Sequence, residues 1–125
     1  MTVLGECIEC VECAYESMLA YAAQGKESDL NGDVSNEAAS DSAPSEIRTT
    51  LSGLRKAVAQ IQAELASSPH AFAKVVIVDI DKAGAALDLV LHQTTLGSEL
   101  VDNLNASIHL RAVLTDLFLI DETHE

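Results

Sequence analysis

The 125-residue sequence predicts an all-α protein, folded as an antiparallel four-helix bundle, and two observations carry this prediction. Apolar residues recur every three or four positions along four long segments, as they do on one face of an α-helix. The connections after the second and third segments are short, which is typical of antiparallel neighbours in a bundle. A chain of this length can bury one core, so we expect residues 1–125 to form a single helical domain.

The first predicted helix covers residues 4–22, with Gly25 as the expected stop. Its apolar stripe consists of Leu4, Ile8, Val11, Tyr15, Met18 and Ala22. The following residues 25–45 are rich in Gly, Ser, Asn and Asp and hold few apolar side chains. This composition is typical of an acidic flexible loop or linker between the first and second helices.

Ser45 is the expected N-cap of the second helix, because its hydroxyl can accept a hydrogen bond from a free backbone N–H of the first turn. The apolar stripe that follows consists of Ile47, Leu51, Leu54, Val58, Ile61 and Leu65. Such an a/d seam can pack inside a bundle or against a second chain. Pro69 is expected at the first position of the third helix, where its missing N–H is not needed.

Residues 74–80, KVVIVDI, admit two interpretations, because a short β-branched run is also typical of a buried parallel strand. A strand at residues 75–80 would make the fold α/β. We favour a helix because no other segment offers a partner strand, and a lone strand would leave its backbone groups unpaired. A helical stripe also continues through the run and consists of Phe72, Val76, Ile80, Ala83, Leu87, Val90 and Thr94.

The fourth predicted helix begins after Gly97 and Ser98. Its apolar stripe consists of Leu100 or Val101, Leu104, Ile108, Leu114, Leu117 and Phe118. Further apolar residues widen this face, namely Leu110, Val113, Leu119 and Ile120. A helix with so wide an apolar face is either central in the bundle or buried against a second copy of the chain.

Composition excludes several classes of function. Twenty Asp and Glu against seven Lys and Arg give a net charge of -13, which repels phosphate backbones and anionic lipid headgroups. We therefore expect no direct nucleic-acid binding and no membrane binding. No stretch reaches the roughly 18 uninterrupted apolar residues of a membrane span, and the first residues lack the pattern of a secretory signal. We expect a cytoplasmic protein, a location that suits three cysteines confined to residues 7–13.

The cysteines form a CxxCxxC run, Cys7, Cys10 and Cys13. Our first interpretation is that they are small buried apolar residues of the first helix, and we expect no cofactor. The alternative is a redox-sensing or metal site, in which the three thiolates hold zinc or an iron–sulfur cluster. On a regular helix the outer two sulfurs lie about 9 Å apart, so shared ligation requires local unwinding. Adjacent glutamates also disfavour the thiolates and oppose metal capture.

Signals of an enzyme are nearly absent, since the sequence holds no P-loop, no GxGxxG, no GxSxG and no HExxH motif. Asp88 and His92 lie one turn apart in the third helix, but such pairs are more often solvated surface contacts. Arg111 is expected to pair with an acid such as Asp116 or Asp88. We therefore expect a protein without catalytic residues.

The distribution of charge is the remaining functional signal. Residues 1–45 hold nine acids and one lysine, and four of these acids form an unneutralised row on the first helix, Glu6, Glu9, Glu12 and Glu16. Such a row can steer toward a cationic surface, so it is our candidate partner-binding site. We expect a small acidic interaction protein that binds a basic protein, as an inhibitor, an immunity-type or nucleic-acid-mimic antagonist, or a small chaperone. The alternatives are the thiol or metal protein above and a structural homodimer that associates through the second and fourth helices.

Overall fold

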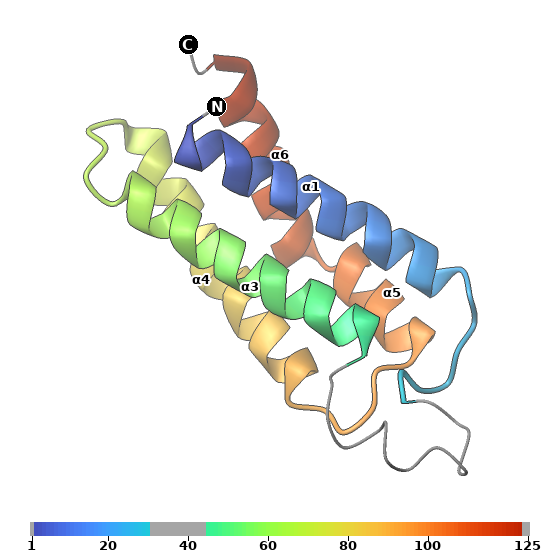
Figure 1. Ribbon diagram of the computed structural model, residues 1–125. Coiled ribbons are helices and arrows are strands. Elements are labelled where there is room, and N and C mark those ends of the chain that lie inside the picture. The colour runs from blue at the N-terminus through green and yellow to red at the C-terminus, as the bar shows by residue number, and fades with distance from the viewer. Residues whose placement is uncertain (1, 31–44, 124–125) are drawn as a thin grey trace.

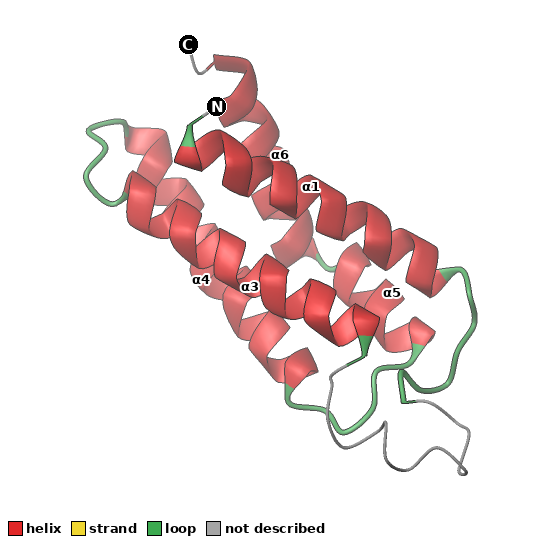
Figure 2. Ribbon diagram, in the orientation of Figure 1, coloured by secondary structure: helices red, strands yellow, loops and turns green. Residues whose placement is uncertain are grey.

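The computed structural model describes residues 2–30 and 45–123, and every regular element within these ranges is a helix (Figure 1). The helices are α1 (Val3–Ala22), α3 (Glu46–Leu65), α4 (Ala71–Leu91), α5 (Ser98–Ala106) and α6 (Ile108–Thr123). Figure 2 shows that loops alone connect them within the described ranges. The all-α prediction is therefore confirmed, and the strand alternative for residues 75–80 is wrong. None of these described helices combines the length and apolar content needed to cross a membrane.

The helices form a bundle in which α5 and α6 together take the place of the fourth helix (Figure 1). α1 packs against α3, α3 against α4, and α4 against α6, while α5 and α6 close the ring against α1. Neighbours run antiparallel, so Arg48 near the start of α3 donates a hydrogen bond to the carbonyl of Leu91 at the end of α4. Among the described residues α1 and α4 share no contact, because they lie diagonally across the bundle.

α3 supplies the most regular part of the core. The hydroxyl of Ser45 accepts a hydrogen bond from the N–H of Arg48 at 3.1 Å, which confirms the predicted N-cap. The six predicted stripe residues are all buried, Ile47, Leu51, Leu54, Val58, Ile61 and Leu65. Burial of each such side chain stabilises the fold by about 1.5–3 kcal/mol. The seam is filled within one chain, so α3 does not offer the dimer surface that we considered for the second helix.

α4 is continuous through residues 74–80, as predicted, because its buried face has helical and not alternating spacing. The predicted start is wrong. The helix begins at Ala71 after an extended residue, so Pro69 lies in the turn that reverses the chain and not at the first helical position. At this end of α4 the buried position belongs to Ala73, and Phe72 is turned partly outward.

The prediction of one continuous fourth helix is wrong, because this part of the chain forms two helices, α5 and α6, which are separated at Ser107 (Figure 1). Ser107 has an extended backbone, with φ -62° and ψ 145°. Its hydroxyl accepts a hydrogen bond from the N–H of Leu110 at 3.3 Å, so Ser107 acts as the N-cap of α6. The break lets α5 pack chiefly against α1 while α6 packs chiefly against α4.

Candidate functional site

The acidic row of α1 lies on the side of the helix that faces away from the core, and it consists of Glu6, Glu9, Glu12 and Glu16. Glu12 is half-buried, and the other three are exposed. At a rise of about 1.5 Å per residue the row extends over about 15 Å. The two ion pairs of the described residues both involve arginines of α3, so neither neutralises the row. The row is therefore an anionic strip that a partner can reach.

The three cysteines are free thiols in different surroundings. Cys7 is half-buried and packs against the core, whereas Cys10 and Cys13 are exposed, so the predicted burial is wrong for two of the three. The helical period explains this difference. The buried positions of α1 in this region are Ile8, Val11 and Ala14, and each directly follows a cysteine. Burial raises the pKa of the Cys7 thiol, and neighbouring negative charges, chiefly that of Cys10, raise it further.

The helix does not bring the three sulfurs together. α1 is continuous from Cys7 through Cys13, and no three His, Cys, Asp or Glu side chains of the described residues lie close enough to hold a metal ion. Ligation of zinc or an iron–sulfur cluster by these cysteines would require a different local conformation of α1. The metal alternative therefore stays a prediction.

Alkylation should separate the cysteines in the folded protein. We expect iodoacetamide to modify Cys10 and Cys13 about tenfold faster than Cys7, because the thiolate reacts and the raised pKa and partial burial of Cys7 limit it. Mass spectrometry of peptides from timed reactions measures each rate. The same reaction in urea is the control, since unfolding makes the three thiols nearly equivalent. Equal rates in the folded chain would contradict the placement of Cys7.

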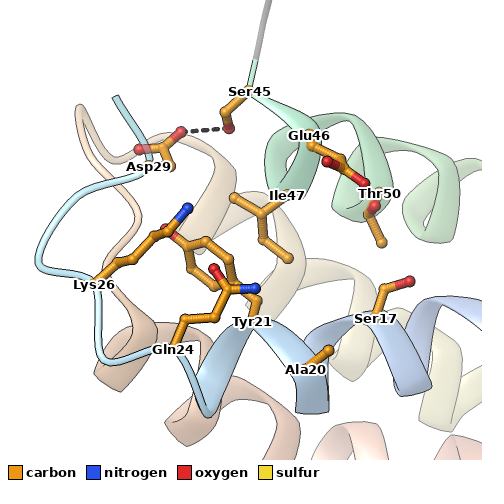
Figure 3. A pocket seen from close by; sticks show the side chains of 10 residues that line it. All are labelled: Ser17, Ala20, Tyr21, Gln24, Lys26, Asp29, Ser45, Glu46, Ile47 and Thr50. Atoms are coloured by element: carbon orange, nitrogen blue, oxygen red, sulfur yellow. Dashed lines mark hydrogen bonds between the residues drawn. The ribbon is translucent and has the colours of Figure 1, made fainter. Parts of the chain in front are cut away.

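Asp29 joins three parts of the chain at one end of the bundle, and Figure 3 shows its hydrogen bond with Ser45. Its Oδ2 accepts hydrogen bonds from the hydroxyl of Ser45 at 2.6 Å and from Nε of Arg48 at 3.4 Å. Its Oδ1 accepts a hydrogen bond from the N–H of Leu96 at 2.6 Å, and its side chain is fully buried. Burial alone would raise the pKa of this carboxyl, but the hydrogen bonds from Ser45 and Leu96 and the charge of Arg48 outweigh it and lower the pKa. Asp29 is thus an ionised structural group.

A polar cavity of about 230 Å³ lies beside Asp29, between the end of α1 and the start of α3 (Figure 3). Tyr21 lines the cavity and donates its hydroxyl to the carbonyl of Leu96 at 2.6 Å, and the ammonium of Lys26 lies 5.7 Å from the centre of the Tyr21 ring. Gly97 is needed at this end, because a Cβ there would lie 2.8 Å from a carbonyl oxygen of the segment after α1. These contacts tie the loops together, so we assign the cavity to the scaffold.

Asp116 of α6 is buried at the contact with α4, where the carboxyl of Asp79 faces it. The residue is 6% exposed, and its Oδ2 has no hydrogen-bond partner among the described residues. Burial raises the pKa of Asp116 to about 7, and the hydrogen bond and negative charge of Asp79 contribute to the shift. The predicted pairing of Asp116 with Arg111 is wrong, since residues five apart point about 140° from each other on a helix.

Asp88 and His92 take separate structural roles. Oδ1 of Asp88 accepts a hydrogen bond from Nε of Arg55 at 2.9 Å, so this carboxylate belongs to an ion pair between α3 and α4. The predicted partner Arg111 is therefore wrong for Asp88 as well. His92 ends α4, and its backbone N–H donates to the carbonyl of Asp88.

No known protein family, curated protein or solved structure matches this chain. Asp29 is engaged inside the fold, the thiols do not converge, and Asp116 is buried. Three carboxylates of the acidic row, by contrast, are exposed on one helix.

Proposed function

We propose that this chain is a non-enzymatic interaction protein whose acidic row docks on a basic surface of another protein. The observation that carries the proposal is the exposure of Glu6, Glu9 and Glu16 on one helix, without a cation from the described chain. Like charges one helical turn apart destabilise a helix by a few tenths of a kcal/mol per pair, so the row is unfavourable in the isolated chain. A cationic partner turns this repulsion into attraction.

The row suits a protein surface with lysines or arginines spaced over a similar length. Exposed carboxylates accelerate association and fix orientation, and their effect weakens as salt is added. The net charge of -13 extends the attraction beyond the row itself. Inhibitors, immunity-type or nucleic-acid-mimic antagonists and small chaperones of basic proteins all share this chemistry. The three free thiols support a reducing, cytoplasmic setting as part of the proposal.

Charge reversal in the row should weaken binding strongly. We expect the double variant Glu9→Lys, Glu12→Lys to bind the basic partner at least about tenfold more weakly at low salt, because two attractive charges become repulsive. The salt dependence of its affinity should also be flatter. Native mass spectrometry of the tagged chain, purified at low salt from its own cells, identifies the partner. Titration calorimetry over a range of salt concentrations then measures both quantities.

The double variant Glu99→Lys, Asp102→Lys is the matched control. Both residues are exposed on α5, and the variant changes the net charge by the same amount. It should keep most of the affinity. If both double variants lost affinity equally, net charge alone would explain the loss. Unchanged affinity in the α1 variant would exclude the acidic row as the docking surface. Recovery of the chain without any basic partner at low salt would overturn the proposed function itself.

A further inference from the structure

The flank of α4 beside α6 carries a second stripe, which we name the outer stripe. It consists of Phe72, Val75, Asp79, Lys82, Ala86 and Leu89. Its spacings of three and four residues alternate, which is the a/d pattern of a coiled coil. Phe72, Val75 and Leu89 are 37%, 47% and 67% exposed, and Lys82 is also exposed. α4 therefore has one stripe in the core of its own bundle and another that is partly exposed, in which Asp79 and Ala86 are half-buried and the other four residues are exposed.

The outer stripe is complementary to itself when a second copy is turned end for end. In this orientation Phe72 meets Leu89 of the partner subunit, Val75 meets the partner's Ala86, and Asp79 meets the partner's Lys82. Each contact occurs twice, as an isologous two-fold interface requires. Apolar residues lie toward both ends and opposite charges lie in the middle. A parallel arrangement would instead place Asp79 on Asp79 and Lys82 on Lys82, which like-charge repulsion disfavours.

Asp79 gives an independent reason for a cation at this position. It is half-buried against Asp116, whose Oδ2 has no hydrogen-bond partner in the described part of the chain. Lys82 lies one turn further along α4 but forms no ion pair with Asp79. Where both carboxyls are ionised, above the raised pKa of Asp116, they form an unfavourable arrangement without a cation, and the partner's Lys82 would relieve it.

The place of the stripe in the fold limits repulsion between two chains that each carry a net charge of -13. The acidic row lies on α1, diagonally across the bundle from α4. Two copies that meet through α4 keep their acidic rows on opposite outer sides. The two bundles lie between the acidic rows and keep them far apart. Exposed charges interact over only about 8 Å at physiological salt, so the rows repel each other little.

The face around the stripe has roughly the area of a small protein–protein interface. α6 packs beside α4 and exposes Ile108 and Leu119 by 77% and 50%. Phe72 also lines an apolar cavity of about 600 Å³ at the start of α4. The partner's Leu89 would lie next to this cavity. A face about 31 Å long and two helices wide measures roughly 600 Å², close to the roughly 800 Å² per partner of standard interfaces.

We propose that this chain forms a two-fold homodimer in which the outer stripes of two α4 helices pack antiparallel, with Asp79 of each chain paired to the partner's Lys82. The dimer leaves both acidic rows exposed. It therefore presents two docking surfaces on opposite sides of one particle. The inference goes beyond the proposed function and does not depend on it.

Sedimentation equilibrium of the full chain tests the dimer directly, with an expected mass of twice 13.2 kDa at micromolar concentration. Lys82→Asp alone and Asp79→Lys alone each bring like charges together and should weaken the dimer at least about tenfold. The double variant exchanges the two charges and should return the dissociation constant to within about threefold of the native value. Direct pairing of positions 79 and 82 across the interface predicts this rescue of the dissociation constant.

Lys74→Asp is the matched control, because Lys74 is exposed on α4 outside the outer stripe. This variant should dimerise like the native chain, and circular dichroism shows whether each variant is folded. Lys82 is exposed, so Lys82→Asp tests the interface even where Asp79→Lys alters folding. The proposal would be overturned by a monomer mass at high micromolar concentration or by an assembly larger than a dimer. It would also be overturned if the double variant dimerised as weakly as the single variants.

Discussion

Asp116→Asn is expected to raise the free energy of unfolding by about 2 kcal/mol at pH 8, although it changes a residue inside the bundle. Burial raises the pKa of Asp116 to about 7 in the folded chain, with Asp79 adding to the shift, whereas the usual value for this carboxyl is 3.8. Between these two pH values the folded state keeps the proton and the unfolded state releases it. The fold therefore loses stability as the pH rises through this range. Asn has a similar size and cannot ionise, so the loss disappears.

Urea unfolding at pH 5 and pH 8 measures this difference. The native chain should lose stability between the two conditions, and Asp116→Asn should lose much less. Asp102→Asn is the matched control, because Asp102 is exposed on α5 and the change removes the same charge. The same pH dependence in all three proteins would contradict the raised pKa. The partner's Lys82 favours the ionised form of the carboxyls at this contact. The stability of the native chain should therefore depend less on pH when the dimer forms.

The helices could be predicted because they depend on spacing that is local in the sequence. The apolar stripe of α3 and the N-cap at Ser45 are both visible in consecutive residues, and both are confirmed. In residues 74–80 the helical period likewise outweighs the β-branched composition. Ser107 marks the limit of this reasoning. The apolar pattern continues through it, and the break reflects the different neighbours of α5 and α6, which only the packed bundle defines.

Groups that packing brings together could not be predicted in the same way. The exposed positions of the acidic row follow from the period of α1 alone. Asp29 and Leu96 are 67 residues apart in the sequence, and no local pattern relates them. Asp79 and Asp116 meet only because α4 and α6 are neighbours. The cysteines are an intermediate case, since the helical period places Cys13 outside the apolar stripe, but the general preference of cysteine for burial pointed the other way.

Asp29→Ala is expected to lower the free energy of unfolding by about 3 kcal/mol, because it removes one acceptor from several buried donors. The hydroxyl of Ser45, the N–H of Leu96 and the guanidinium of Arg48 would all lose the carboxylate that they share. Ser45 also caps α3, so the start of this helix should fray. Asp29→Asn keeps the size and one oxygen but not the charge, and should lose about half as much.

Urea unfolding at pH 7 measures both variants, with Glu27→Ala as an exposed control two residues away. Equal stability of Asp29→Ala and the native chain would contradict the structural role of this carboxylate.

Because hydrogen bonds and Arg48 hold the pKa of Asp29 below its usual 3.8, its contribution is complete above that pH and is lost as the pH falls through the lower folded value. Asp116 acts in the opposite sense and destabilises the fold above the same pH. The native chain should therefore be most stable at about pH 4, near the unfolded value that both carboxyls share, and Asp29→Ala should flatten only the acid side of that profile.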